Sequence, residues 1–296
     1  MAIESSRLAK RAAQLRISAI SLAENMRNGY FKSLYRGQGI EFSDVREYQP
    51  FDNIRSIDWN VTARMGRAFI KQYEEDRELS VFFVLDCSFS MDSSSFSSPK
   101  LNQAVETTAL LLLAAEHNSG AIGAVFFDGQ IRFSLAPKAG HENSMLLLSN
   151  LDKLTSLSEE ERFNGSCLPN AIQGASKLLK KRSLVFILSD FRAANWESAF
   201  ATLAQKNDLV AIRITSPEDE ELPALGALPI CDSESRAKTI LPLFSKRFKK
   251  NWREGNESRI SKWKDFCIKH GAFPLLLSTQ EDAAQVLSRF FKQKSR

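Results

Sequence analysis

Four short apolar runs recur along the chain, and segments with helical periodicity separate them. The runs are Leu79–Leu85, Ala121–Phe127, Ser183–Leu188 and Leu209–Ile214. Each has the length of a β-strand and is rich in large apolar side chains, which favours a strand covered on both faces. Strands that alternate with helices predict an α/β fold with a mostly parallel sheet and helices on both faces. In such a sheet, binding sites lie beyond the carboxyl ends of the strands.

The segments between and around these runs are expected to form the helices and the peripheral strands. The expected helices span residues 3–26, 100–117, 142–152, 168–180, 195–206, 243–270 and 281–293. Further strands are expected over residues 131–135, near 225–230 and 237–241, and over 273–277. The apolar seam of the first helix fits docking on the chain's own core, with a coiled-coil dimer as the alternative. We therefore expect an N-terminal extension, residues 1–78, packed on a main domain, residues 79–296.

The composition limits which classes of protein the chain can belong to. The chain has 296 residues and is 43% hydrophobic, enough to bury one large core. Its N-terminus lacks the apolar segment of a signal peptide. The longest apolar run, Ala109–Ala115, is far shorter than the roughly 20 residues of a membrane-spanning helix. The four cysteines form no CxxC pair, which fits a reducing compartment. We expect a cytoplasmic protein without a membrane span.

The C-terminal fifth of the chain is basic. Residues 236–296 carry 15 Lys and Arg against 5 Asp and Glu. Such a segment can bind nucleic acid or anionic lipid, but a solvated helix face is the preferred interpretation. The aromatic residues Trp252, Trp263 and Phe266 fit helix packing and form no recognisable nucleic-acid motif. We expect no nucleic-acid partner.

Oxygen-bearing side chains follow two of the buried strands. Asp86, Ser88 and Ser90 come after the first run, and Ser189-Asp190 follows the third. Alternate side chains of an extended chain point the same way, so the three oxygens of the DxSxS segment face one spot. One carboxylate and two hydroxyls suit a hard cation such as Mg²⁺ or Mn²⁺, and suit zinc poorly. The alternative is a polar strand end whose serines cap a helix.

The DxSxSM segment after an apolar strand resembles the metal-ion-dependent adhesion site of von Willebrand factor A domains. That family completes its site with a threonine from a later loop and an aspartate after a further strand. The resemblance implies that Asp190 is the aspartate and that Ser166, just before the helix over 168–180, replaces the threonine. It also implies a site that binds a protein partner through an acidic side chain and has no catalytic residues.

Residues 37–80 carry a long signature that begins around GIEFSDVREYQP and ends with FIKQYEEDRE. It resembles the bacterial family called domain of unknown function 58, whose members have a von Willebrand A-like domain and are often encoded beside MoxR-type AAA ATPases. The resemblance implies such an ATPase or its client as the partner. Four arginines between residues 46 and 67 could hold phosphates, but the interleaved acids favour structural ion pairs. Trp59 is expected to pack.

An enzyme of the haloacid-dehalogenase-like phosphatase type is the alternative function. That family also places an aspartate after its first buried strand and needs Mg²⁺, but its usual pattern is DxD. The second acid acts as a general acid, and Ser88 at that position cannot do so at neutral pH. The chain also lacks a GxxxxGK[ST] loop for ATP. The sequence therefore favours a binding module that works with an ATPase over an enzyme.

Overall fold

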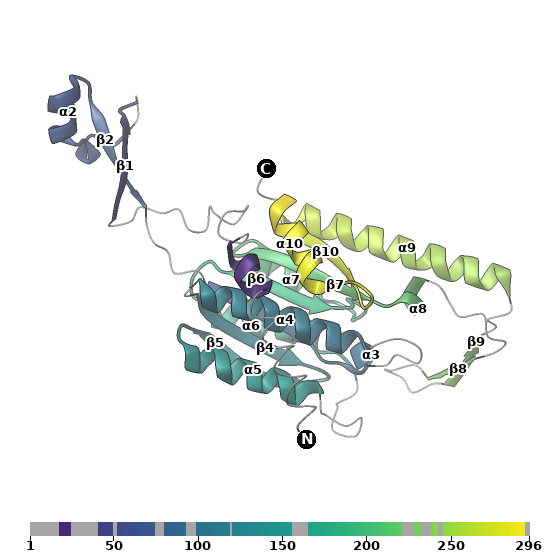
Figure 1. The fold of residues 1–296 in the computed structure, drawn as a ribbon. Helices are drawn as coiled ribbons and strands as arrows, with labels where there is room; N and C mark the ends of the chain where they lie inside the picture. Colours follow the sequence, from purple (N-terminus) through teal and green to yellow (C-terminus); the bar gives the residue numbers. More distant parts are fainter. Residues whose placement is uncertain are drawn as a thin grey trace.

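The computed structural model describes residues 18–24, 41–49, 52–74, 80–92, 99–118, 120–155, 165–220, 228–231, 238–241 and 245–293. Its central feature is a six-stranded sheet with the order β10-β7-β6-β3-β4-β5 (Figure 1). The strands are β3 Ser80–Asp86, β4 Ala121–Phe127, β5 Ile131–Lys138, β6 Leu184–Ser189, β7 Asp208–Thr215 and β10 Phe273–Ser278. All neighbouring pairs are parallel except β4 and β5. The α/β fold class predicted from the sequence is confirmed.

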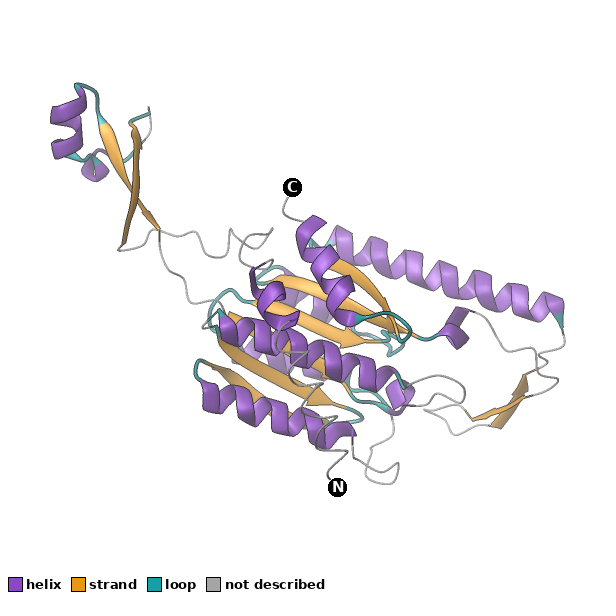
Figure 2. Cartoon of the chain, in the orientation of Figure 1, coloured by secondary structure: helices purple, strands orange, loops and turns teal. Residues whose placement is uncertain are grey.

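Helices cover both faces of this sheet (Figure 2). One face packs on residues 18–24 and on α4 Lys100–His117, α5 His141–Thr155 and α10 Ala283–Gln293. The other packs on α6 Leu168–Leu178, α7 Glu197–Ala204 and α9 Lys246–Lys269. The side chains of β3 alternate between the two cores, with Phe83 in the first and Phe82 in the second. This double burial explains why the strand sequence is continuously apolar.

The predicted helices and strands of the main domain are confirmed, with ends that shift by a few residues. The predicted peripheral strands form an antiparallel pair, β8 Leu228–Cys231 and β9 Lys238–Leu241. The basic helix α9 starts after Ser245, whose hydroxyl accepts a hydrogen bond from the backbone N–H of Phe248 at 3.2 Å. Two short helices, α3 Phe89–Asp92 and α8 Pro217–Glu220, follow β3 and β7. Among the described helices, none combines the length and the apolar character needed to cross a bilayer.

The signature region, residues 37–80, contains a β-hairpin that was not predicted from its sequence. Strands β1 Glu41–Glu47 and β2 Phe69–Glu74 pair antiparallel, and the short helices η2 Ile54–Ser56 and α2 Trp59–Met65 connect them. Arg46 forms a two-pronged ion pair with Asp52 at 2.6 and 2.8 Å, which confirms a structural role for this arginine. The expectation that Trp59 packs is wrong, because the side chain is 68% exposed.

One described part of the N-terminal extension packs against the core of the main domain. Residues 18–24 are helical, and Ala19, Leu22 and Ala23 are buried in the core beside α4. This agrees with docking of the predicted helix 3–26, whose other residues lie outside the described ones. The hairpin forms a sheet of its own, drawn apart from the six-stranded sheet in Figure 1. Packing of the whole extension, residues 1–78, on the main domain stays a prediction.

Candidate metal centre

The carboxyl ends of β3 and β6 form the switch point of the sheet. From β3 the chain crosses to β4 on one side, and β6 later pairs with β3 on the other side. Connections that leave in opposite directions open a crevice at this edge of a parallel sheet. Asp86 ends β3 and Ser189 ends β6, so the polar residues of both predicted strand ends lie at this crevice.

Asp86 is almost fully buried, with 1% of its surface exposed. Its Oδ1 accepts a hydrogen bond from the backbone N–H of Ser88 at 3.0 Å, and its Oδ2 accepts one from the hydroxyl of Ser189 at 2.6 Å. The hydroxyls of Ser88 and Ser90 lie 3.2 Å apart. The chain after Asp86 therefore turns so that the oxygens of the DxSxS segment gather on one side.

Asp190 lies beside this group and is also buried. Its Oδ1 accepts a hydrogen bond from the backbone N–H of Arg192 at 3.1 Å, whereas its Oδ2 has no hydrogen-bond partner among the described residues. The nearest cations to Oδ2 are Lys100 Nζ at 3.8 Å and Arg192 Nε at 3.7 Å. Burial, and then the negative charge of Asp190, raise the pKa of Asp86 to about 7, although hydrogen bonds from Ser189 and Ser88 lower it. Two buried carboxylates thus repel each other at this edge.

The loop that carries Ser166 is anchored at the neighbouring strand end. The backbone N–H of Cys167 donates to the carbonyl oxygen of Asp128, the residue that follows β4, at 2.8 Å. Burial and the charges of Asp128 and Asp86 raise the pKa of the Cys167 thiol to about 11, so this loop lies near Asp86. The Ser166 hydroxyl is buried and has no hydrogen-bond partner within the part of the chain that the structure describes.

The described residues contain no group of three His, Cys, Asp or Glu side chains arranged to hold a metal ion. The five predicted ligands include only two carboxylates, Asp86 and Asp190, and the other three are serines. A site built from them depends on hydroxyl oxygens, as hard cations allow.

Residues 44–260 match the family described as "Protein of unknown function DUF58". The chain belongs to the DUF58 family. An uncharacterized protein of Mycobacterium tuberculosis (strain ATCC 25618 / H37Rv) is 27% identical over 234 residues, covering 79% of this chain and 73% of the relative. The protein YeaD of Bacillus subtilis is 30% identical over 81 residues, covering 27% of this chain and 18% of that protein.

Solved structures with a related architecture are more distant in sequence. An aerotolerance-related membrane protein from Bacteroides fragilis has a TM-score of 0.48 at 14% identity, covering 73% of this chain and 98% of that one. The SpRpn10 VWA domain has a TM-score of 0.39 at 10% identity, covering 71% and 94%. The DUF58 chain has an α/β fold, with five parallel strands, one antiparallel edge strand and helices on both faces.

Three polar residues around the candidate metal centre were not assigned a role from the sequence. Ser189 is fully buried, and its hydroxyl joins Asp86 Oδ2 to the backbone N–H of Phe191. Lys100, at the start of α4, is 5% exposed and pairs with Asp219 Oδ2 at 2.9 Å. The sequence marked Ser189 as a hydroxyl at the end of a buried strand, but not its hydrogen bond to Asp86. The Lys100–Asp219 pair joins residues 119 positions apart and leaves no local signal.

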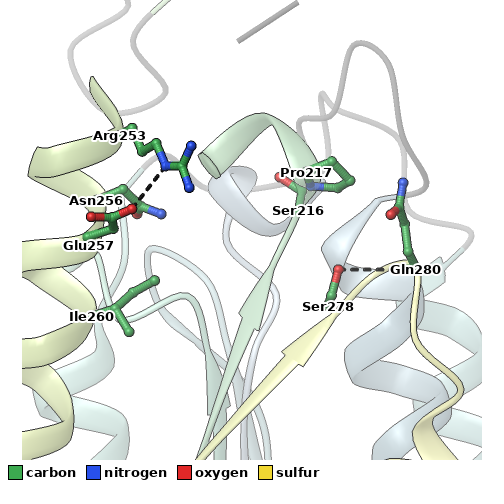
Figure 3. Close-up of a pocket in the computed structure, with 8 residues that line it drawn as sticks. All are labelled: Ser216, Pro217, Arg253, Asn256, Glu257, Ile260, Ser278 and Gln280. Atoms are coloured by element: carbon green, nitrogen blue, oxygen red, sulfur yellow. Dashed lines mark hydrogen bonds and ion pairs between the residues drawn. The ribbon is translucent and has the colours of Figure 1, made fainter. Parts of the chain in front are cut away.

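A separate cavity of about 330 Å³ lies further along the same edge of the sheet (Figure 3). Its walls come from the ends of β7 and β10 and from α9, and include Ser216, Asn256 and Ser278. An ion pair between Arg253 Nε and Glu257 Oε1, at 3.0 Å, lies on its α9 side (Figure 3). None of the five predicted ligands lines this cavity, so it is distinct from the candidate metal centre.

Proposed function

We propose that this protein is a metal-dependent protein-interaction module. Asp86, Ser88, Ser90, Ser166 and Asp190 would hold one Mg²⁺ or Mn²⁺ ion. The partner would contribute an acidic side chain, as the resemblance to the metal-ion-dependent adhesion site implies. Asp86 and Asp190 lie at the carboxyl ends of β3 and β6, at the switch point of the sheet, and this position supports a binding role.

The observation that carries this proposal is the pair of buried carboxylates with oxygens left unsatisfied around them. Asp86 and Asp190 repel each other, while Asp190 Oδ2 and the Ser166 hydroxyl lack hydrogen-bond partners. Buried polar oxygens without partners are unfavourable, and a hard cation would satisfy both oxygens and remove the repulsion. Ser189 and the backbone N–H of Ser88 would hold the Asp86 carboxylate in place.

Three hydroxyls and two carboxylates leave a divalent cation partly neutralised. A bound Mg²⁺ would supply an open coordination position that a carboxylate oxygen of the partner can fill. The buried surroundings of Asp86 and Ser88 strengthen such a contact once the partner excludes water. A MoxR-type AAA ATPase or its client is the partner that the family resemblance implies. In this proposal the module serves the assembly, maturation or regulation of protein complexes.

The first experiment tests the metal. Mg²⁺ or Mn²⁺ added to chelator-treated protein should raise the melting temperature, because a ligand at 100 times its Kd stabilises the folded state by about 2.7 kcal/mol. Asp86→Asn should abolish this rise. Asp128→Asn is a matched control, since Asp128 is a buried acid at the neighbouring strand end and pairs with Arg132. An equal rise in the wild type and in Asp86→Asn would contradict the proposal.

The second experiment tests the partner. A purified MoxR-type ATPase from the same cell should bind the wild-type protein with Mg²⁺ and lose binding with EDTA or in Asp86→Ala. Replacing the partner's acidic residue and chelating the metal should have similar, non-additive effects, because both break the same contact. Binding that persists in EDTA would exclude a metal-bridged contact.

A further inference from the structure

A second pocket, of about 430 Å³, lies on the α9 side of the sheet. Its cationic lining residues come from the loop after β6, from β7 and from α9: Arg192, Arg213, Arg259 and Lys262. The only acid among its lining residues is Glu197. We call this the arginine pocket. It contains none of the five candidate metal ligands and none of the residues that line the cavity of Figure 3.

Two of its arginines form no ion pair with any residue that the structure describes. Arg213 is only 5% exposed, and its guanidinium lies over the ring of Trp263 at 5.7 Å. Within the described part of the chain, no carboxylate lies within ion-pair distance of Arg213 or Arg259, whereas Arg192 pairs with Asp219. Burial lowers the pKa of Arg213, and the charges of Arg192 and Arg259 lower it further, while the charges of Asp190 and Asp219 oppose this shift.

Among the described residues, the charges of Asp190 and Asp219 act on Arg213 and Arg259 without forming an ion pair with either, so these converging cations are only partly neutralised in the absence of a ligand. A buried charge without a counter-ion lowers stability, and such arrangements are typical of binding sites. Guanidinium groups provide planar sets of donors that match carboxylate and phosphate oxygens. The charge of this pocket therefore selects an anion.

The walls of the pocket are aromatic. The ring of Trp196 lies edge-to-face with Phe191 and with Phe266, each at 5.2 Å between centroids, and the Phe191 and Trp263 rings are 5.3 Å apart. Phe191 has a φ of 52°, a left-handed conformation that a bulky residue rarely adopts. Such strain is kept where surrounding contacts hold a residue for a function. These aromatic side chains line the pocket together with the cations.

We propose that the arginine pocket binds a small anion that carries a flat ring, such as an aromatic phosphate or carboxylate. The arginines bind the anionic group, and the ring packs against the aromatic wall. A cavity of about 430 Å³ has the size of a small-molecule site. The inference does not depend on the candidate metal centre, because it rests on residues outside the five ligands.

Isothermal titration calorimetry with phenyl phosphate tests this inference directly. We expect a Kd of about 0.1–1 mM, which is typical of a fragment of this size. Benzyl alcohol carries the ring without the charge, and inorganic phosphate carries the charge without the ring. Each should bind at least about tenfold more weakly. Equal binding of benzyl alcohol would exclude anion recognition, and equal binding of inorganic phosphate would exclude recognition of the ring.

Three matched variants locate the site. Arg213→Met and Arg259→Met keep much of the side-chain volume and remove one charge each, so each should weaken phenyl phosphate at least about tenfold. Arg247→Met removes the same charge from α9 outside the pocket and should bind as the wild type does. Arg259 is exposed, so its replacement tests the proposal even where loss of the buried Arg213 disturbs folding. Wild-type affinity in Arg259→Met would overturn the assignment.

Discussion

In the metal-free protein, repulsion between the buried carboxylates of Asp86 and Asp190 lowers the stability of the folded state. The substitution Asp86→Asn removes this repulsion. Asp86→Asn keeps the shape of the side chain and deletes its negative charge. The amide oxygen can still accept the backbone N–H of Ser88, which now lies 3.0 Å from Oδ1. The amide NH₂ can donate to the Ser189 hydroxyl, which now donates to Oδ2 at 2.6 Å. We therefore expect the metal-free variant to be more stable than the metal-free wild type.

The size of the gain follows from the pKa of Asp86. Burial and the charge of Asp190 raise this pKa from 3.8 to about 7. One pKa unit corresponds to about 1.4 kcal/mol, so the ionised form is disfavoured in the folded state by about 4 kcal/mol. The new amide group must also be hydrogen-bonded in a buried place, which offsets part of the gain. We expect the free energy of unfolding of metal-free Asp86→Asn to exceed that of the metal-free wild type by about 1–3 kcal/mol at pH 8.

Urea unfolding in EDTA at pH 8 measures this difference through the midpoint of the transition. The same variant should lose all stabilisation by Mg²⁺, so that metal reverses the order of stability between the two proteins. Asp128→Asn should behave differently. It removes the negative charge that pairs with Arg132 at 2.6 Å, and this loss should destabilise the protein. A metal-free Asp86→Asn protein less stable than the wild type would refute the reasoning about carboxylate repulsion.

Three further predictions concern pH, the hairpin and catalysis. Because the folded state holds the Asp86 proton more tightly than the unfolded state, the stability of the metal-free wild type should fall as pH rises from about 4 to about 7. Urea midpoints across this range should show the fall, and Asp86→Asn should flatten it. Trp59→Ala should change the unfolding free energy by less than about 0.5 kcal/mol, because the side chain is 68% exposed. A loss of about 2 kcal/mol or more in the same urea assay would show that Trp59 packs against other residues. The purified protein with Mg²⁺ should not hydrolyse phosphate esters above background, because Ser88 cannot act as a general acid; Asp86-dependent turnover would contradict a pure binding role.

The central sheet was predictable because its strands are buried on both faces. Burial on two faces leaves a continuous apolar run, as in Val81–Leu85, that ends at the buried acid Asp86. The hairpin was not predictable, because charged residues such as Arg46 and Glu47 fill its strands and obscure the period of two. Its Trp59 gave no local sign of whether it is buried or exposed.

The candidate metal centre was predictable where its residues are near in sequence. The DxSxS spacing predicted that Asp86, Ser88 and Ser90 lie together, but the physical reason differs: the chain is not extended here, because Ser90 lies in the short helix α3 and the turn after β3 brings the oxygens together. The hydrogen bond from Ser189 to Asp86 joins residues 103 positions apart, and only the pairing of β3 with β6 brings them together. The arginine pocket likewise combines three separate elements, so the sequence shows its cations only as scattered charges.

The segment after β6 joins the two proposed sites, which leads to a prediction about their coupling. Asp190 belongs to the candidate metal centre, and Arg192 both lines the arginine pocket and lies 3.7 Å from Asp190 Oδ2. An anion in the pocket attracts Arg192 and adds negative charge nearby, so both effects should favour a cation at Asp190.

Saturating phenyl phosphate should therefore tighten Mg²⁺ binding several-fold, and thermodynamic linkage requires Mg²⁺ to tighten phenyl phosphate by the same factor. Calorimetric titrations of each ligand with and without the other measure both factors. In Arg192→Met the factor should shrink toward one, because Arg192 links the two sites, while Arg247→Met should keep it. Independent binding of the two ligands in the wild type, or a weaker affinity for Mg²⁺ with phenyl phosphate bound, would show that Arg192 does not transmit charge between them.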